Sequence, residues 1–148
     1  MDKKTIEQII EEDGKFVCTT SGVSMEPLFK DRRDTVIIFR TQGRLKKYDV
    51  PLYKRGEEYV LHRIIKVLPD SYVICGDNCE RYEYDITDKD IIGYLGAFYR
   101  KNKYCTVDNK MYRVYSFLRV HTYKLRMFFK KMRYFIARCY RKVFKKKI

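Results

Sequence analysis

Several features that would assign a protein class are missing from this sequence. It has no tryptophan, three prolines and two histidines among its 148 residues. No run of about 18 apolar residues occurs, so it predicts no ordinary membrane-spanning helix. The charged first segment, MDKKTIEQIIEEDGK, lacks an apolar stretch, and we therefore expect no secretory signal peptide. No internal repeat is visible, and the length suits one domain rather than two.

The cysteines do not form a recognisable framework. There are five of them, at positions 18, 75, 79, 105 and 139. An odd number with irregular spacing is not typical of a small disulfide-linked secreted domain. Cys75 and Cys79 lie four apart, but no second Cys or His pair completes a zinc site. We expect reduced thiols that serve packing or lie on the surface, no metal, no cofactor and a cytoplasmic location.

Acidic residues are absent from the last part of the chain. Residues 111–148 contain 13 Lys or Arg and no Asp or Glu, whereas the first 110 residues carry 20 basic and 19 acidic side chains. The chain therefore divides into a nearly neutral body, residues 1–110, and a basic tail, residues 111–148. Any prediction of a charged partner is a prediction about the tail.

The body is predicted to consist mainly of short strands. Residues 4–12 indicate a helix with Thr5 as its N-cap and Gly14 at its end. Strand composition recurs in six further segments: 15–20, 35–40, 49–54, 58–68, 72–75 and 91–99. Pro51 indicates an edge strand, Gly93 and Gly96 a bulge or bend, and residues 76–90 a polar loop. This pattern favours a mostly β fold, either a small partly open barrel or a pair of sheets.

The segment Ser21-Gly22-Val23-Ser24-Met25-Glu26-Pro27 carries the strongest chemical signal. A serine on a tight turn, stiffened by glycine and proline, presents an exposed hydroxyl on a rigid support. Serine is a weak nucleophile unless a neighbouring base takes its proton. We therefore predict Ser24 as a nucleophile, with Ser21, Gly22 and Met25 as supporting residues of the turn.

His62 is the candidate base, because the other histidine, His121, lies in the basic tail. His62 falls in a predicted strand beside apolar residues, and burial would keep its imidazole neutral. A third group usually orients such a base. Asp77, which follows the return strand of the same hairpin, is the first candidate, and Glu83 and Asp85 are alternatives. Arg63 would pair with a nearby carboxylate.

Five segments in order resemble the boxes of type I signal peptidases and the related self-cleaving repressors. SGVSMEP resembles their nucleophile box, YDVPLYKR their middle box, and VLHRI the base-bearing strand of the branch that uses His. CGDN and then DIIGYLG resemble the last boxes. The resemblance covers about residues 15–99. It implies the signal-peptidase type of β fold and a cofactor-free serine endopeptidase that cuts a peptide or protein precursor, such as a signal or leader segment, after small residues.

Two departures from that family leave an alternative open. Many relatives carry a serine two positions before the nucleophile, where this chain has Gly22, so backbone N–H groups and Ser21 would have to stabilise the oxyanion. The usual membrane-spanning helix before the nucleophile box is also not seen. The alternative is an inactive or regulatory member of the fold that binds nucleic acid or a membrane through its tail. No helix-turn-helix precedes the body, which counts against a repressor.

The basic tail predicts one long amphipathic helix. From Val114 onward, apolar residues recur in steps of three and four, with basic residues between them. Such a helix suits an anionic membrane surface, contacted by residues 112–148, and would make the protein peripheral at the membrane. Its apolar face would also suit packing against the body or a second copy. Its charge and aromatic residues would suit nucleic acid.

Overall fold

The computed structural model describes residues 4–144, which form two antiparallel sheets, one helix before them and two helices after them. The first helix is α1 (Ile6–Asp13). The strands are β1 (Lys15–Thr19), β2 (Thr35–Phe39), β3 (Pro51–Arg55), β4 (Glu58–Leu61), β5 (Arg63–Val67), β6 (Tyr72–Cys75), β7 (Glu83–Ile86), β8 (Ile91–Arg100) and β9 (Lys103–Thr106). A 3-10 turn, η1 (Asp88–Asp90), precedes β8, and the helices α2 (Lys110–His121) and α3 (Tyr123–Phe144) follow β9.

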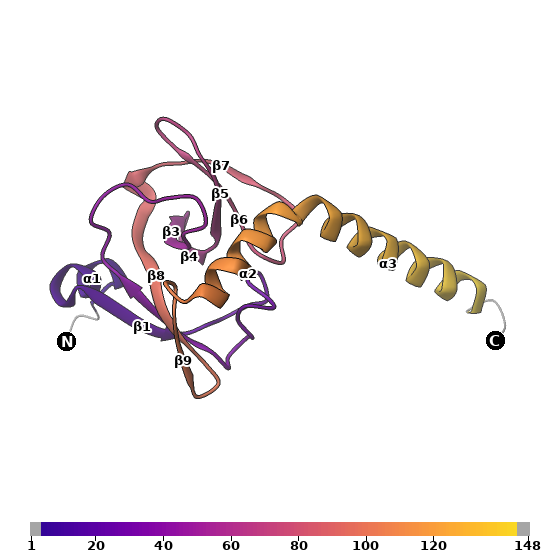
Figure 1. Cartoon of the computed structure of the whole chain (residues 1–148), viewed down its shortest axis with the longest axis horizontal. Coiled ribbons are helices and arrows are strands. Elements are labelled where there is room, and N and C mark those ends of the chain that lie inside the picture. Colours follow the sequence, from indigo (N-terminus) through magenta and orange to yellow (C-terminus); the bar gives the residue numbers. More distant parts are fainter. Residues whose placement is uncertain (1–3, 145–148) are drawn as a thin grey trace.

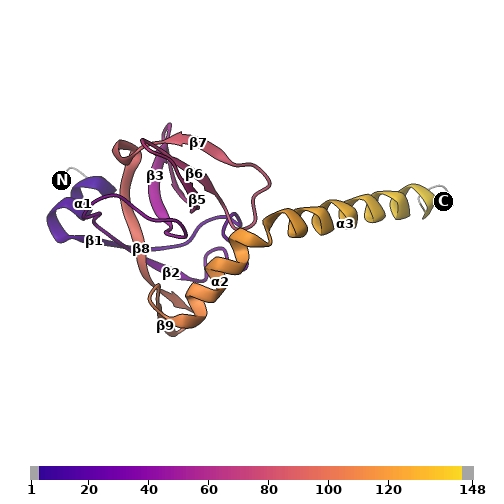
Figure 2. The same cartoon turned by 45° about the horizontal axis from the view of Figure 1, so that its top comes forward.

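The larger sheet has six strands built around β8. Its order is β1-β2-β8-β3-β4, with β9 paired to the far half of β8. The smaller sheet has the order β5-β6-β7. The paired-sheet prediction is confirmed at this level, and the arrangement is not a closed barrel. With the helices α1, α2 and α3 beside the two sheets, the described chain is mixed α/β rather than mostly β. Figures 1 and 2 show the sheets grouped together, with α1 at one end and α3 extending away at the other.

The local signals at α1 and in β8 are confirmed. The Thr5 hydroxyl accepts from the Gln8 N–H, and Gly14 ends the helix at a φ of 72°. In β8, Ile37 pairs with Ala97 and Ile38 with Leu95, so Gly96 is the bulged residue. A Cβ at Gly96 would lie 2.4 Å from the Phe39 ring, which leaves room only for glycine.

The expectation that Pro51 marks an edge strand is wrong. The strand β3 lies between β4 and β8 inside the six-stranded sheet. Pro51 is tolerated because it is the first residue of the strand, and the adjacent ladder bond is made by the Leu95 N–H to the Val50 carbonyl at 2.9 Å.

The predicted strand 58–68 is two strands in different sheets. Residues 58–61 pair with β3 in the larger sheet, and residues 63–67 pair with β6 in the smaller one. His62 is the residue between them. The hairpin with 72–75 is confirmed, closed by the Leu68 N–H to the Ser71 carbonyl at 2.9 Å.

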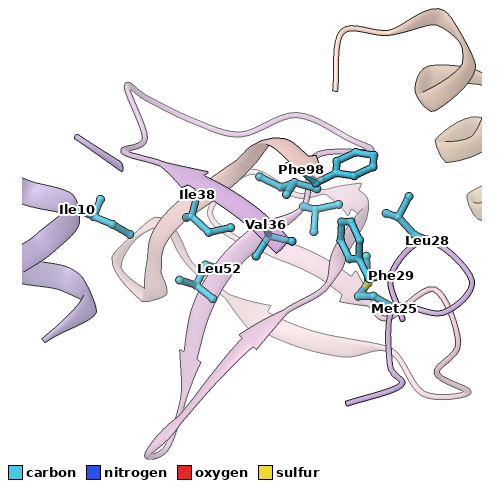
Figure 3. Close-up of a cluster of buried hydrophobic side chains, with 10 residues drawn as sticks. Ile10, Met25, Leu28, Phe29, Val36, Ile38, Leu52 and Phe98 are labelled. Atoms are coloured by element: carbon cyan, nitrogen blue, oxygen red, sulfur yellow. The ribbon is translucent and has the colours of Figure 1, made fainter. Parts of the chain in front are cut away.

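The main core lies between the large sheet, α1 and the loop after β1. Figure 3 shows this cluster, in which three residues of the loop (Met25, Leu28 and Phe29) pack with Val36, Phe98 and other strand residues. The loop that carries Ser24 is therefore fixed by burial of its own apolar side chains.

The single long tail helix that we expected is also corrected. The helix breaks at Thr122, whose N–H and hydroxyl both bond the Leu118 carbonyl, and α3 starts at the next residue. The division at residue 110 stays a prediction, although α2 packs closely on the body. Among the described residues, no helix is both long enough and apolar enough to cross a bilayer.

Candidate active site

Ser24 lies on a turn anchored on both sides. Gly22 has a φ of 88°, a conformation that favours glycine, and its N–H donates to the Asp31 carboxylate at 2.7 Å. Met25 is 5% exposed and belongs to the main core. Ser24 itself is half-buried, and Ser21 is exposed on the surface. The predicted rigid support for Ser24 is therefore present.

His62 is held at the crossover between the two sheets. It is 5% exposed. Its Nδ1 lies 2.8 Å from Glu83 Oε1 and 3.2 Å from the Tyr53 hydroxyl. Burial lowers the pKa of His62 below its ordinary value, while the neighbouring Glu83 carboxylate opposes this shift. The imidazole is thus kept neutral and aligned through Nδ1, which leaves Nε2 to accept a proton.

The expectation that Asp77 orients His62 is wrong. The Asp77 carboxylate makes a two-pronged ion pair with Arg63, through Nε and Nη2 at 2.8 Å each, and accepts from the Tyr115 hydroxyl at 2.9 Å. The physical reason is the hairpin register. Arg63 pairs with Cys75, which carries Gly76 rather than Asp77 to the position opposite His62.

Glu83, one of the two alternative acids, is the carboxylate at His62. It arrives on β7, in a segment that the sequence predicted as loop, and it also lies 3.5 Å from Arg55. Asp85 is exposed and has a φ of 62°, so the usual alternation of side chains is broken there. Asp85 is therefore not part of the site.

The Ser24 backbone and the His62 ring both lie against Gly76. A Cβ added there would lie 2.8 Å from the Ser24 carbonyl oxygen and 3.0 Å from His62 Cδ2. The Asn78 N–H donates to the same Ser24 carbonyl at 2.8 Å, and the Asn78 amide donates to the Val23 carbonyl at 3.1 Å. The turn after β6 thus joins the serine loop to the histidine, and it requires glycine at its closest point.

Within residues 4–144, the Ser24 hydroxyl makes no hydrogen bond to His62. Nε2 instead faces the Cys79 thiol at 3.9 Å, and burial raises the pKa of that thiol. Catalytic hydrogen bonds often tighten only when substrate binds. The backbone N–H groups of Ser24 and Met25 donate no hydrogen bond within the described residues, which leaves them available to an oxyanion.

The sequence did not identify several contributors to this site. Gly76 carries the close approach, Tyr53 and Cys79 contact the imidazole, and Arg119 donates to the Glu26 and Asp77 carbonyls at 3.0 and 2.7 Å. Arg119 thereby ties the serine loop to the Gly76 turn from the tail. Among the other contacts around the site, the pairing of Arg63 with a carboxylate was predicted, and it is confirmed.

The described residues contain no cluster of three or more His, Cys, Asp or Glu side chains that is arranged to hold a metal ion. All five cysteines are unpaired. A cavity of about 1260 Å³ lies between the 42–50 loop, β8, β9 and α2, and neither Ser24 nor His62 lines it.

We compared the chain with known protein families, curated proteins and solved structures, and it matches none of them. The geometry of the site itself is therefore the basis for the chemistry proposed below.

Proposed function

We propose that this protein is a serine endopeptidase of the signal-peptidase-like kind, with Ser24 as nucleophile, His62 as general base and Glu83 as the acid that orients it. The observation that carries the proposal is the approach of the Ser24 backbone and the His62 ring to Gly76, with Glu83 on the far nitrogen of the imidazole. The five family-like segments are also linked by strand pairing and by the bond from the Asn78 N–H to the Ser24 carbonyl, which supports the signal-peptidase type of fold.

The proposed reaction is acyl transfer. Ser24 Oγ attacks the carbonyl carbon of the scissile peptide bond, and Nε2 of His62 takes the hydroxyl proton. The free N–H groups of Ser24 and Met25 stabilise the oxyanion. His62 then protonates the leaving amine, and a water molecule activated by the same base releases the acyl group from Ser24. The substrate is a peptide or protein precursor, such as a signal or leader segment, and the chemistry requires no cofactor.

The pH dependence follows from the environment of His62. The base works in its neutral form, so activity is full above the pKa of His62 and is lost as pH falls through it. Because burial lowers this pKa, we expect the midpoint below the ordinary value of 6.5. Glu83→Gln removes the group that opposes the shift, so its midpoint should move to still lower pH. Peptidase rates measured between pH 4 and 10 test this, and activity that appears only above about pH 9 would indicate a lysine base.

The proposal is tested by comparing protein N-termini in cells that carry the wild type or Ser24→Ala. We expect a set of N-termini that depends on Ser24, with small residues before the cut. Ser71→Ala, in the turn between β5 and β6, is the matched control and should produce the wild-type set. Identical N-termini in wild type and Ser24→Ala, at equal expression, would contradict the peptidase proposal.

The position of Cys79 favours a second candidate, a thiol peptidase. Its Sγ is 3.9 Å from Nε2 of the candidate base. The raised pKa of Cys79 disfavours the thiolate that such a mechanism needs. Cys79→Ala distinguishes the two: if serine is the nucleophile, cleavage should persist in Cys79→Ala and be lost in Ser24→Ala, and if the thiol is the nucleophile, the reverse should hold.

An inactive member of the fold is the remaining alternative. The glycine at position 22 and the lack of a Ser24–His62 hydrogen bond favour it. It predicts that neither Ser24→Ala nor His62→Ala changes any N-terminus, and that function resides in the basic tail. The five unpaired thiols support placing the body in a reducing compartment under either proposal.

A further inference from the structure

The outer face of α3 is a continuous apolar stripe that packs on nothing in the described chain. Its members are Leu125, Phe128, Phe129, Met132, Phe135 and Ile136, each between 43% and 67% exposed. Large apolar side chains rarely gather on a free surface without a partner.

This stripe points away from the body. Helix α3 rests on the body through Tyr123 and Met127, which are 9% and 8% exposed and pack near Cys75 and Tyr82. Met132 follows Tyr123 by nine positions, which is two and a half helical turns and therefore the opposite face. The usual amphipathic helix buries its apolar face. Here two apolar residues, Tyr123 and Met127, make the internal contacts together with Arg126 and Lys130, and the larger apolar face is outermost.

Positive charge flanks the stripe on both sides. Lys124, Lys131 and Arg138 border one edge, and Arg133 borders the other, by the same helical spacing. Residues 111–148 contain no acidic side chain to neutralise them. An apolar stripe bordered by basic residues matches an anionic lipid surface, where aromatic and aliphatic groups enter the headgroup layer and the cations meet lipid phosphates.

The charge pattern disfavours the other occupants. A second copy of α3 would bring one basic border against another with no carboxylate between them. Nucleic acid would be held by the basic borders, yet the Phe-rich stripe would stay in water. Figures 1 and 2 both show α3 extending beyond the body, so its outer face is open along its length.

We propose that α3 lies in the plane of an anionic membrane surface with this apolar stripe immersed in it. The body then sits on the opposite side of the helix. The Lys130 ammonium donates to the Asn78 carbonyl at 3.1 Å, and Arg126 donates to the Asp77 carbonyl at 3.1 Å. The turn after β6, which lies between Ser24 and His62, is therefore held within one helix diameter, ~10 Å, of the lipid. The placement of an active site near the lipid rests on the proposed peptidase function, whereas the contact of α3 with the membrane does not.

The test is sedimentation of the full chain with vesicles. Wild type should bind phosphatidylcholine vesicles containing phosphatidylglycerol at least tenfold more tightly than pure phosphatidylcholine vesicles, and salt should weaken the binding. Phe128→Ser combined with Phe135→Ser should lower the affinity at least about a hundredfold, because two buried aromatic side chains are lost. Tyr134→Ser is the matched control, since Tyr134 is exposed on α3 but lies off the stripe.

A fluorescence measurement keeps the proposal testable if sedimentation is ambiguous. The chain has no tryptophan, so Phe128→Trp and Tyr134→Trp each introduce a single reporter. Anionic vesicles should shift the emission of Phe128→Trp to the blue and change that of Tyr134→Trp much less. The proposal would be overturned by equal emission shifts at the two positions, or by an unchanged affinity of the double serine variant. It would also be overturned if the protein did not bind vesicles but dimerised or bound DNA instead. The Ser24→Ala protein should bind vesicles like wild type, so this result is separable from the peptidase test.

Discussion

Replacing His62 with alanine should lower the rate of peptide cleavage by at least about a thousandfold. The imidazole lies between Glu83 and Gly76, and the other histidine, His121, instead contacts the Tyr48 hydroxyl. General-base catalysis contributes about a hundredfold to ten-thousandfold, and removing one member of a catalytic unit often costs nearly as much as removing all of it. The measurement is a single-turnover rate on a peptide that spans a cut found by comparing N-termini.

Variants of the two nearby carboxylates, Glu83 and Asp77, test which of them orients His62. Glu83→Gln should lower the same rate at least about a hundredfold, because the amide no longer stabilises the imidazolium that forms at Nδ1. Asp77→Asn should leave the rate per folded molecule within about tenfold, since Asp77 bonds Arg63 and not His62. Folded fractions measured by circular dichroism correct both rates. A large loss in Asp77→Asn with little change in Glu83→Gln would reverse the assignment.

The difference between these carboxylates shows what the sequence did not determine. Gly-Asp-Asn after the return strand suggested that Asp77 would lie beside His62. A bulge between Ile64 and Lys66 shifts the hairpin register by one residue, so Arg63 pairs with Cys75 and Asp77 no longer lies opposite His62. Glu83 was not singled out because β7 contains one aliphatic residue, Ile86, within a polar segment, and its exposed residues, Tyr84 and Asp85, are adjacent rather than alternating.

The helices of the tail show a second limit of prediction from the sequence. The periodicity found the apolar positions correctly as helical, including Leu118, Leu125 and Met132. The periodicity did not indicate which face of each helix packs against the body. Side chains of α2 such as Tyr115, Ser116 and Arg119 bind buried polar partners, and that arrangement has no hydrophobic signature. The break at Thr122 involves neither glycine nor proline, so no local signal announced it.

Arg63 is a buried charged group that joins the body to the tail. It is 0% exposed, and its Nη1 donates to the Tyr48 carbonyl at 3.1 Å, the Tyr112 hydroxyl at 3.3 Å and the Ser116 hydroxyl at 2.7 Å, besides its ion pair with Asp77. Burial disfavours its charge, but the Asp77 carboxylate outweighs this, so the pKa of Arg63 is raised. The guanidinium thus stays charged while it joins the small sheet to α2.

Arg63→Met should destabilise the protein by about 3–5 kcal/mol, because it leaves the Asp77 carboxylate buried without its cation. Urea denaturation followed by circular dichroism measures the change. Asp77→Leu should cost a similar amount for the converse reason. The double variant should cost clearly less than the two single changes added together, because a buried ion pair replaced by apolar groups of similar volume leaves no unpaired charge.

Arg40→Ala is the control for loss of an ion pair as such. Arg40 lies 3.8 Å from Glu11 with both side chains largely exposed, so removing it should change the free energy of unfolding by at most about 1 kcal/mol. Strict additivity of Arg63→Met and Asp77→Leu would mean that the two groups stabilise the fold independently. The hydrogen bonds from Arg63 to α2, rather than the ion pair, would then account for its effect, and Ser116→Ala should reproduce part of that loss on its own.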